Sequence, residues 1–160
     1  MKTQFVHRRN KLAESIQSGI AVIPTNKEVV RNKDAHFPYR FDSYFHYLTG
    51  FGEPESVIVI FGGETPRSIL FCRDKNEEKE IWDGFRHGPE SARTLFHFDA
   101  AHSIDEIDQI LPQLIENKDT IYTPLGADAA WDGQMMRWLN QTRSRVREGI
   151  AAPDGLIDVR

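Results

Sequence analysis

The 160-residue chain has a single cysteine, Cys72, and this scarcity excludes two kinds of structure. One thiol cannot close an intrachain disulfide, and it cannot complete a cysteine-rich zinc site. Long apolar runs are also missing: the N-terminal stretch MKTQFVHRRNKLAES is interrupted by charges, and no run approaches the roughly 18 apolar residues of a membrane span. The sequence therefore predicts a soluble protein of a reducing, cytoplasmic setting.

An excess of positive charge is missing as well. The chain has 20 Lys and Arg against 24 Asp and Glu, which gives a formal net charge of −4. This balance does not favour a nucleic acid backbone or an anionic membrane as partner. The chain does have an ordinary apolar share, 39% hydrophobic and 11% aromatic, which predicts one folded domain over residues 1–160.

Patterns of helix and strand alternate along the chain. Apolar residues at helical spacing predict helices over 3–17, 89–94, 103–117 and 127–143, the third with a capping box formed by Ser103 and Glu106. Short apolar runs predict strands over 20–23, 44–48, 56–61, 68–72, 95–98 and 120–123, with a hairpin between 56–61 and 68–72 and the start of a last strand in the tail. A long polar loop over 25–42 lies between them. The order predicts an α/β fold, a mixed β-sheet flanked by helices.

Recognisable catalytic and metal-binding motifs are missing from this pattern. The six histidines form no ligand motif, and the nearest pair, His97 and His102, fits a surface position better than a metal site. The first predicted strand, Ile20 to Ile23, carries no carboxylate, which argues against a two-metal nuclease. No GxSxG motif is present, and Cys72 ends an apolar run that predicts a buried, unreactive thiol. The sequence therefore predicts no catalytic residue and no metal ligand.

The segment from Ile81 to Arg86 mixes apolar and charged residues around Gly84. Gly84 permits a sharp turn that would direct Trp82 or Phe85 outward, and an exposed indole would need a partner. Alternatively Trp82 fills the core, and the large area that an indole buries favours this second interpretation. Helical spacing likewise predicts core positions for Trp131 and Trp138.

Three stretches of the chain together resemble the N-terminal domain of Xaa-Pro aminopeptidases, also called aminopeptidase P, of the creatinase and prolidase superfamily. They are RNKDAHFPYR at 31–40, YFHYLTGFGEPE at 44–55 and EIWDG at 80–84. The resemblance implies a ribonuclease H-like core, followed after residue 160 by a catalytic domain of pita-bread fold. That catalytic domain would hold two divalent metals, usually manganese, and no residue of this chain matches its ligands.

The resemblance also implies a role for this chain. In bacterial members the N-terminal domain helps to build tetramers and contributes to a neighbouring subunit's substrate pocket, and Trp82 and Asp34 match the contributing positions. Asp83 and the residues 85–87 depart from the family pattern. The expected function is that of a non-catalytic domain of a metallopeptidase that removes an N-terminal residue preceding proline, by attack of metal-bound hydroxide on the peptide carbonyl. A prolidase-type parent, and a free-standing interaction or regulatory domain without a catalytic partner, remain alternatives.

Overall fold

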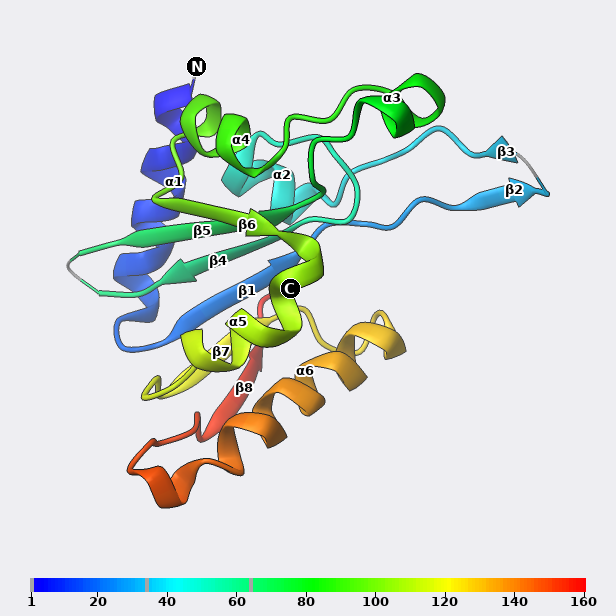
Figure 1. Cartoon of the computed structure of the whole chain (residues 1–160). Coiled ribbons are helices and arrows are strands. Elements are labelled where there is room, and N and C mark those ends of the chain that lie inside the picture. The colour runs from blue at the N-terminus through cyan, green and yellow to red at the C-terminus, as the bar shows by residue number, and fades with distance from the viewer. Residues whose placement is uncertain (1, 34, 64) are drawn as a thin grey trace.

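The computed structural model describes residues 2–33, 35–63 and 65–160 and shows an α/β fold around a six-stranded mixed sheet (Figure 1). The strands are β1 (Ile20–Pro24), β4 (Val57–Phe61), β5 (Arg67–Cys72), β6 (Ala100–Ser103), β7 (Thr120–Thr123) and β8 (Gly155–Asp158). Their spatial order is β6-β5-β4-β1-β7-β8. β4 runs antiparallel to β1 and β5, whereas the other three pairs are parallel. The order from β5 to β8, with β4 reversed, is ribonuclease H-like.

Helices cover both faces of this sheet, as predicted (Figure 1). One face packs against α1 (Lys2–Ile16), α2 (Ser43–Thr49) and α4 (Pro89–Phe96), and the other against α5 (Ile107–Leu114) and α6 (Ala129–Arg143). Successive residues of β1 alternate between the two layers: Ala21 and Ile23 belong to the first core cluster, Ile20 and Val22 to the second. This double burial explains why the strand is an uninterrupted apolar run.

The segment from Tyr44 to Leu48 is a helix, and the strand predicted there is wrong. The Asp42 side chain accepts a hydrogen bond from the backbone N–H of Phe45, which caps the start of α2, and Gly50 ends the helix in the left-handed conformation with φ 70°. Phe45 and Leu48 point into the core from one side of the helix, while Tyr44 and Tyr47 remain exposed. The aromatic composition of this segment is typical of a strand, but the Asp42 cap favours the helix.

Two further boundaries differ from the prediction. The strand expected over 95–98 begins later, at Ala100, because Leu95 and Phe96 complete α4 and the chain turns at His97 with φ 58°. The helix expected over 103–117 is split into a short 3₁₀ turn, Ile104–Glu106, and α5. Ser103 is the N-cap of this turn, as predicted, but its Oγ accepts from the N–H of Asp105 at 3.2 Å rather than from that of Glu106, so the hydrogen bond expected for a capping box is replaced by a shorter-range one.

The structure adds elements that no apolar pattern indicated. α3 (Glu77–Asp83) lies in a polar stretch, and β2 (Val30–Asn32) pairs antiparallel with β3 (Ala35–His36) inside the predicted loop. A short 3₁₀ turn, Val146–Glu148, precedes β8, the strand expected in the tail. No residue of α3, β2 or β3 is buried among those described, so these elements lack the periodic apolar face from which helices and strands are predicted.

Candidate functional site

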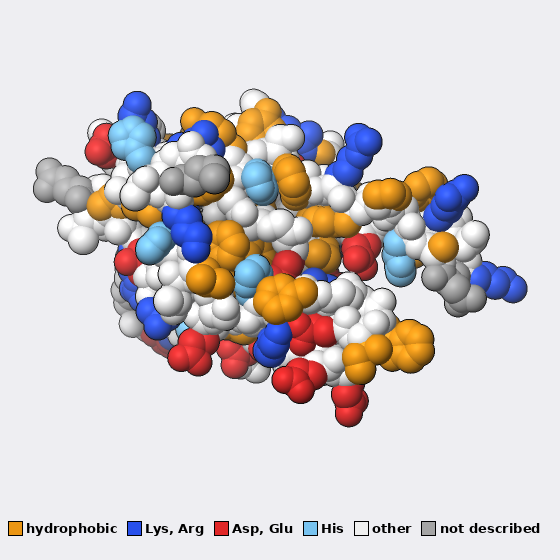
Figure 2. Space-filling model, turned by 90° about the horizontal axis from the view of Figure 1, so that it is seen from above, with side chains coloured by type: hydrophobic (Ala, Val, Ile, Leu, Met, Phe, Trp, Pro, Cys, Tyr) orange, Lys and Arg blue, Asp and Glu red, His pale blue; other side chains and the backbone are white. Residues whose placement is uncertain are grey.

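Two segments project from the same end of the sheet (Figure 1). We call residues 74–88, which contain α3, the α3 arm, and residues 30–33 with 35–36 the β2–β3 hairpin. Seen from above, both carry hydrophobic side chains and leave an open notch between them (Figure 2). The exposed apolar residues on and beside these segments are Val29, Val30 and Phe37 at the hairpin and Ile81, Trp82 and Phe85 on the arm.

Trp82 is the most exposed large hydrophobic residue of the described chain, at 86%. The interpretation that places it in the core is therefore wrong, and the outward-facing alternative is correct. The cause is local: α3 is short, it begins at the Asn76 cap, and it ends at Gly84, whose φ of 89° favours glycine. Residues 81–85 are all exposed, so the arm presents its apolar side chains to solvent instead of burying them.

The other two tryptophans lie against the core, as predicted. Trp138 is 2% exposed, and its Nε1 donates to Asp108 Oδ1 at 2.9 Å. Trp131 is half-buried and donates from Nε1 to Thr123 Oγ1 at 2.9 Å. Each indole N–H is thus satisfied where the ring is packed, which is the usual condition for burying a tryptophan.

Asp34, the second residue that the resemblance assigns to a substrate pocket, lies outside the described residues. Its neighbours at 30–33 and 35–36 form the β2–β3 hairpin. Tyr39, later in the same loop, shares a 2.8 Å hydrogen bond between its hydroxyl and Thr25 Oγ1. Burial raises the pKa of the Tyr39 hydroxyl, so it stays protonated at neutral pH.

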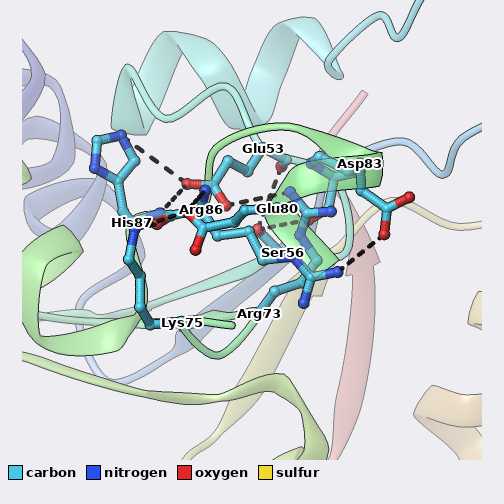
Figure 3. A network of polar contacts seen from close by, with 9 residues as sticks. Glu53, Ser56, Arg73, Lys75, Glu80, Asp83, Arg86 and His87 are labelled. Carbon is cyan, nitrogen blue, oxygen red and sulfur yellow. Dashed lines mark hydrogen bonds and ion pairs between the residues drawn. The ribbon is translucent and has the colours of Figure 1, made fainter. Parts of the chain in front are cut away.

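A cluster of charged side chains joins the base of the arm to the body (Figure 3). Glu53, from the loop between α2 and β4, accepts from Arg73 Nη2 at 3.3 Å and from the backbone N–H of His87 at 2.9 Å. Within the arm, Glu80 Oε1 accepts from Lys75 Nζ at 2.6 Å and from the backbone N–H of Arg86 at 2.8 Å. The hydrogen bond from Lys75 is the main cause that lowers the pKa of the Glu80 carboxyl.

No pattern in the sequence indicates this cluster. Both glutamates belong to the stretches that carry the family resemblance, Glu53 to 44–55 and Glu80 to 80–84. They are distant in sequence, however, and the partners of Glu53 come from the residue after β5 and from the segment before α4. Only the tertiary fold brings these segments together. The contacts of Glu53 therefore could not be predicted from the spacing of residues in the sequence.

A groove of about 960 Å³ lies between the loop after β1 and the beginning of α6. Tyr39 and Arg40 line it on one side, Trp131 and Arg137 on the other, and Arg160 lies at its edge. Its apolar and cationic lining suits contact with another polypeptide surface more than a compact reaction centre.

The described residues offer binding surface rather than a metal centre. Among them, no three or more His, Cys, Asp or Glu side chains are grouped so that they could hold a metal ion. Cys72 is fully buried, which confirms its predicted core position, and burial raises the pKa of its thiol to about 12. In the part of the chain that is described, no helix has the length and apolar character needed to cross a membrane.

Comparisons with known proteins agree with one another. The family described as "Aminopeptidase P, N-terminal domain" matches residues 5–122. The chain is 36% identical over 162 residues to the Xaa-Pro aminopeptidase of Escherichia coli (strain K12), covering 99% of this chain and 37% of that protein. It is 31% identical over 127 residues to Xaa-Pro aminopeptidase 3 of Homo sapiens, covering 71% of this chain and 25% of that protein.

Solved structures show the same similarity in three dimensions. The zinc-substituted aminopeptidase P of E. coli in complex with product superposes with a TM-score of 0.95 at 36% identity, covering 100% of this chain and 37% of that one. The aminopeptidase of Pseudomonas aeruginosa superposes with a TM-score of 0.92 at 38% identity, covering 99% and 36%. The chain thus spans little more than a third of the length of these proteins.

Proposed function

The chain belongs to the family of aminopeptidase P N-terminal domains, and from this premise we propose that it serves a metal-dependent Xaa-Pro aminopeptidase as a non-catalytic binding domain. In this role it contributes to the assembly of a homo-oligomer and to the substrate pocket of a neighbouring subunit. The observation that carries the proposal is the position of Trp82, exposed at the end of an arm that projects from the body. The similarity to complete peptidases favours this role over that of a free-standing interaction domain.

An exposed indole is suited to an intermolecular contact. A tryptophan side chain can bury about 150–250 Å² of surface, and tryptophan is among the residues most often found at the energetic centre of interfaces. We propose that the face of Trp82 packs against an apolar part of the peptide substrate. Asp34 would place a carboxylate near the ammonium group of the peptide, an assignment that rests on the resemblance alone.

The metal chemistry is assigned to another part of the protein. Two divalent metals, in the family usually manganese, would supply the activated water that attacks the peptide carbonyl. The described residues do not fit such a pair, because they bring no ligand set together. The chain's own contribution is to bind and orient the peptide, in an enzyme that we place in the cytoplasm.

A complementation experiment tests whether Trp82 acts on a neighbour. One full-length subunit carries Trp82→Ala and an intact catalytic part, and the second carries an intact Trp82 and a catalytic part disabled at a metal ligand. Trp82→Ala alone should lower kcat/KM for an Xaa-Pro peptide by about tenfold or more, as loss of a central aromatic contact does. The co-assembled pair should recover activity, because the second subunit's arm completes the first subunit's pocket.

The control pair carries Trp82→Ala in both subunits and should show no recovery. Recovery that is absent from the first pair as well would mean that Trp82 serves its own subunit. Unchanged kinetics of the single variant would remove Trp82 from the substrate pocket altogether.

A further inference from the structure

We propose that Glu53 and Glu80 are positioning residues that fix the α3 arm and thereby hold Trp82 where a neighbouring subunit's substrate meets it. Glu53 ties the arm to the body of the domain, and Glu80 closes the arm on itself. The inference rests on the proposed function of Trp82 and extends it to two residues that do not touch the substrate. Neither carboxylate is explained by the packing of the core.

Glu53 is bound by both ends of the arm. Arg73 directly follows β5, where the chain leaves the sheet, and His87 lies where it returns to begin α4. One carboxylate oxygen of Glu53 accepts from the Arg73 guanidinium, and the other accepts from the His87 backbone N–H (Figure 3). One side chain therefore binds next to both ends of the arm and links them to the body of the domain.

This tether is shielded from water. The side chains of Arg73 and Glu53 are 8% and 11% exposed, so their attraction is screened less than that of a surface pair. The two ends of the arm also touch directly: a Cβ added at Gly88 would lie 3.0 Å from Lys75 Cβ. The base of the arm is therefore a closed structure, with Glu53 as its link to the α2–β4 loop.

Glu80 performs the equivalent task inside the arm. Its Oε1 accepts from Lys75 before α3 and from the backbone N–H of Arg86 after it. Lys75 Nζ also donates to the carbonyl oxygen of Arg86 at 2.9 Å, which closes a ring of hydrogen bonds across the arm. Trp82 follows Glu80 by two residues, roughly 3 Å along the helix axis. A restraint on Glu80 is thus a restraint on Trp82.

Helix α3 itself contributes little packing against the body of the domain. Residues 81–85 are exposed, and α3 contributes no buried residue. The ring of Phe85 packs edge-on against that of His87, with 4.8 Å between the ring centroids, and its centroid lies 4.3 Å from Lys75 Nζ. These contacts of Phe85 are thus made with residues at the base of the arm. Because α3 has no apolar face on the sheet, its position depends on the base of the arm. The base is held by this polar cluster, by the nearly buried Arg86, and by the His87 ring, whose centroid lies 5.7 Å from that of Phe51 and 5.3 Å from that of Phe96.

Fixing the arm in advance has a definite kinetic consequence. A contact residue that is ordered before binding loses less conformational freedom when the substrate arrives. Loosening the arm should therefore raise KM for the peptide more than it lowers kcat. The loss in kcat/KM should reach about tenfold, since small misplacements of a binding group can be that costly.

The first measurement is amide hydrogen exchange, followed by mass spectrometry, of the full-length peptidase. Glu80→Gln and Glu53→Gln should accelerate exchange in residues 76–88 by at least about threefold and leave β1 and β4 unchanged. Glu78→Gln, on the exposed side of the same helix, and Glu55→Gln, an exposed neighbour of Glu53, are the matched controls and should match the wild type. If Glu53→Gln also loosens the sheet, Glu80→Gln and Lys75→Met carry the test, because those two residues lie in the arm itself.

The second measurement is a double-mutant cycle in peptide kinetics. Glu80→Gln and Glu53→Gln should each raise KM in the wild-type background and have no further effect in the Trp82→Ala background, because they act through that indole. If the two glutamates had a purely structural role, the losses of kcat/KM caused by Glu→Gln and by Trp82→Ala would instead be additive.

Each contrary result has a distinct meaning. Unchanged exchange in residues 76–88 would overturn the positioning role alone. Faster exchange with unchanged KM, while Trp82→Ala is impaired, would show that the indole needs no tether and would overturn it too. A harmless Trp82→Ala would overturn the proposed function, and with it the presentation of Trp82, even where the exchange results agree.

Discussion

Arg9 carries a positive charge into the interior of the domain. The residue is 2% exposed, and its guanidinium donates to the carbonyl oxygens of Leu48, Phe96 and His97 at 2.9, 3.1 and 3.0 Å. These carbonyls lie at the ends of α2 and α4, where the backbone has no helical partner and the helix dipole is negative. Burial lowers the pKa of Arg9 to about 10, which still leaves it charged at neutral pH.

Arg9→Met should therefore destabilise the chain clearly. The substitution keeps an apolar stem but leaves buried carbonyl oxygens without a donor, at a cost of about 2–4 kcal/mol in the free energy of unfolding. Lys11→Met, at an exposed position of the same helix, should change it by less than about 0.5 kcal/mol. Denaturant unfolding of both variants compares them, and equal midpoints would show that the three hydrogen bonds contribute nothing.

Cys72 allows a prediction that depends on pH. Burial raises the pKa of its thiol from 9.0 to about 12, so at pH 8 only about one native thiol in ten thousand is ionised. We expect a disulfide reagent to leave the folded chain unmodified up to about pH 10 and to modify one thiol after unfolding. Because the unfolded thiol ionises first, this group costs native stability as the pH rises from 9 towards 12. Rapid modification at pH 8 under native conditions would contradict the buried assignment.

At the scale of elements, a substitution in the central strand β4 tests the assignment of the sheet. Ile58 is fully buried and lies between Ile23 of β1 and Leu70 of β5. Ile58→Asp places an unpaired charge there and should unfold the chain, at a cost above about 4 kcal/mol. Val30→Asp, in the exposed strand β2, should keep the wild-type melting temperature. A folded Ile58→Asp variant would mean that the strand assignment is wrong.

Substitutions of two tryptophans distinguish a position in the arm from one in the core in the same way. Trp138→Ala should cost about 3–5 kcal/mol of unfolding free energy, because it empties a packed site, whereas Trp82→Ala should cost less than about 0.5 kcal/mol. Equilibrium unfolding of the 160-residue chain measures both values. A large loss of unfolding free energy in Trp82→Ala would mean that Trp82 is a core residue.

How well an element could be predicted from the sequence depends on whether its own residues or more distant contacts determine its structure. β1, β4 and β5 are largely apolar and almost entirely buried, so their composition identified them. α2 depended on a cap between Asp42 and Phe45 that outweighs an aromatic, strand-like composition. The exposure of Trp82 could not be deduced, because nothing in the neighbouring residues states whether an indole will find a buried site.

At the scale of the whole molecule, the fold divides into a packed body and projecting segments. The two core clusters draw all their residues from the six-stranded sheet, from α1, α2, α4, α5 and α6, and from loops beside them, and none from the α3 arm. In the proposed function, stability and binding therefore depend on different parts of the chain. A binding surface built in this way can be altered without loss of the fold.

Removal of the arm tests this division directly. Replacing residues 77–85 by a short Gly-Ser linker removes Trp82 and Glu80 and no core residue, and it retains Glu53, Arg73 and His87 at the base. The melting temperature should fall by no more than about 2–4 °C, which corresponds to a loss of about 1 kcal/mol or less for a domain of this size. In the full-length peptidase, kcat/KM for an Xaa-Pro peptide should fall to the level of Trp82→Ala and no further if the proposed contact between the arm and the substrate is made by the indole alone. A deeper loss would assign contacts to other arm residues, with Ile81 and Phe85 as the exposed apolar candidates, and collapse of the fold would show that the arm belongs to the body after all.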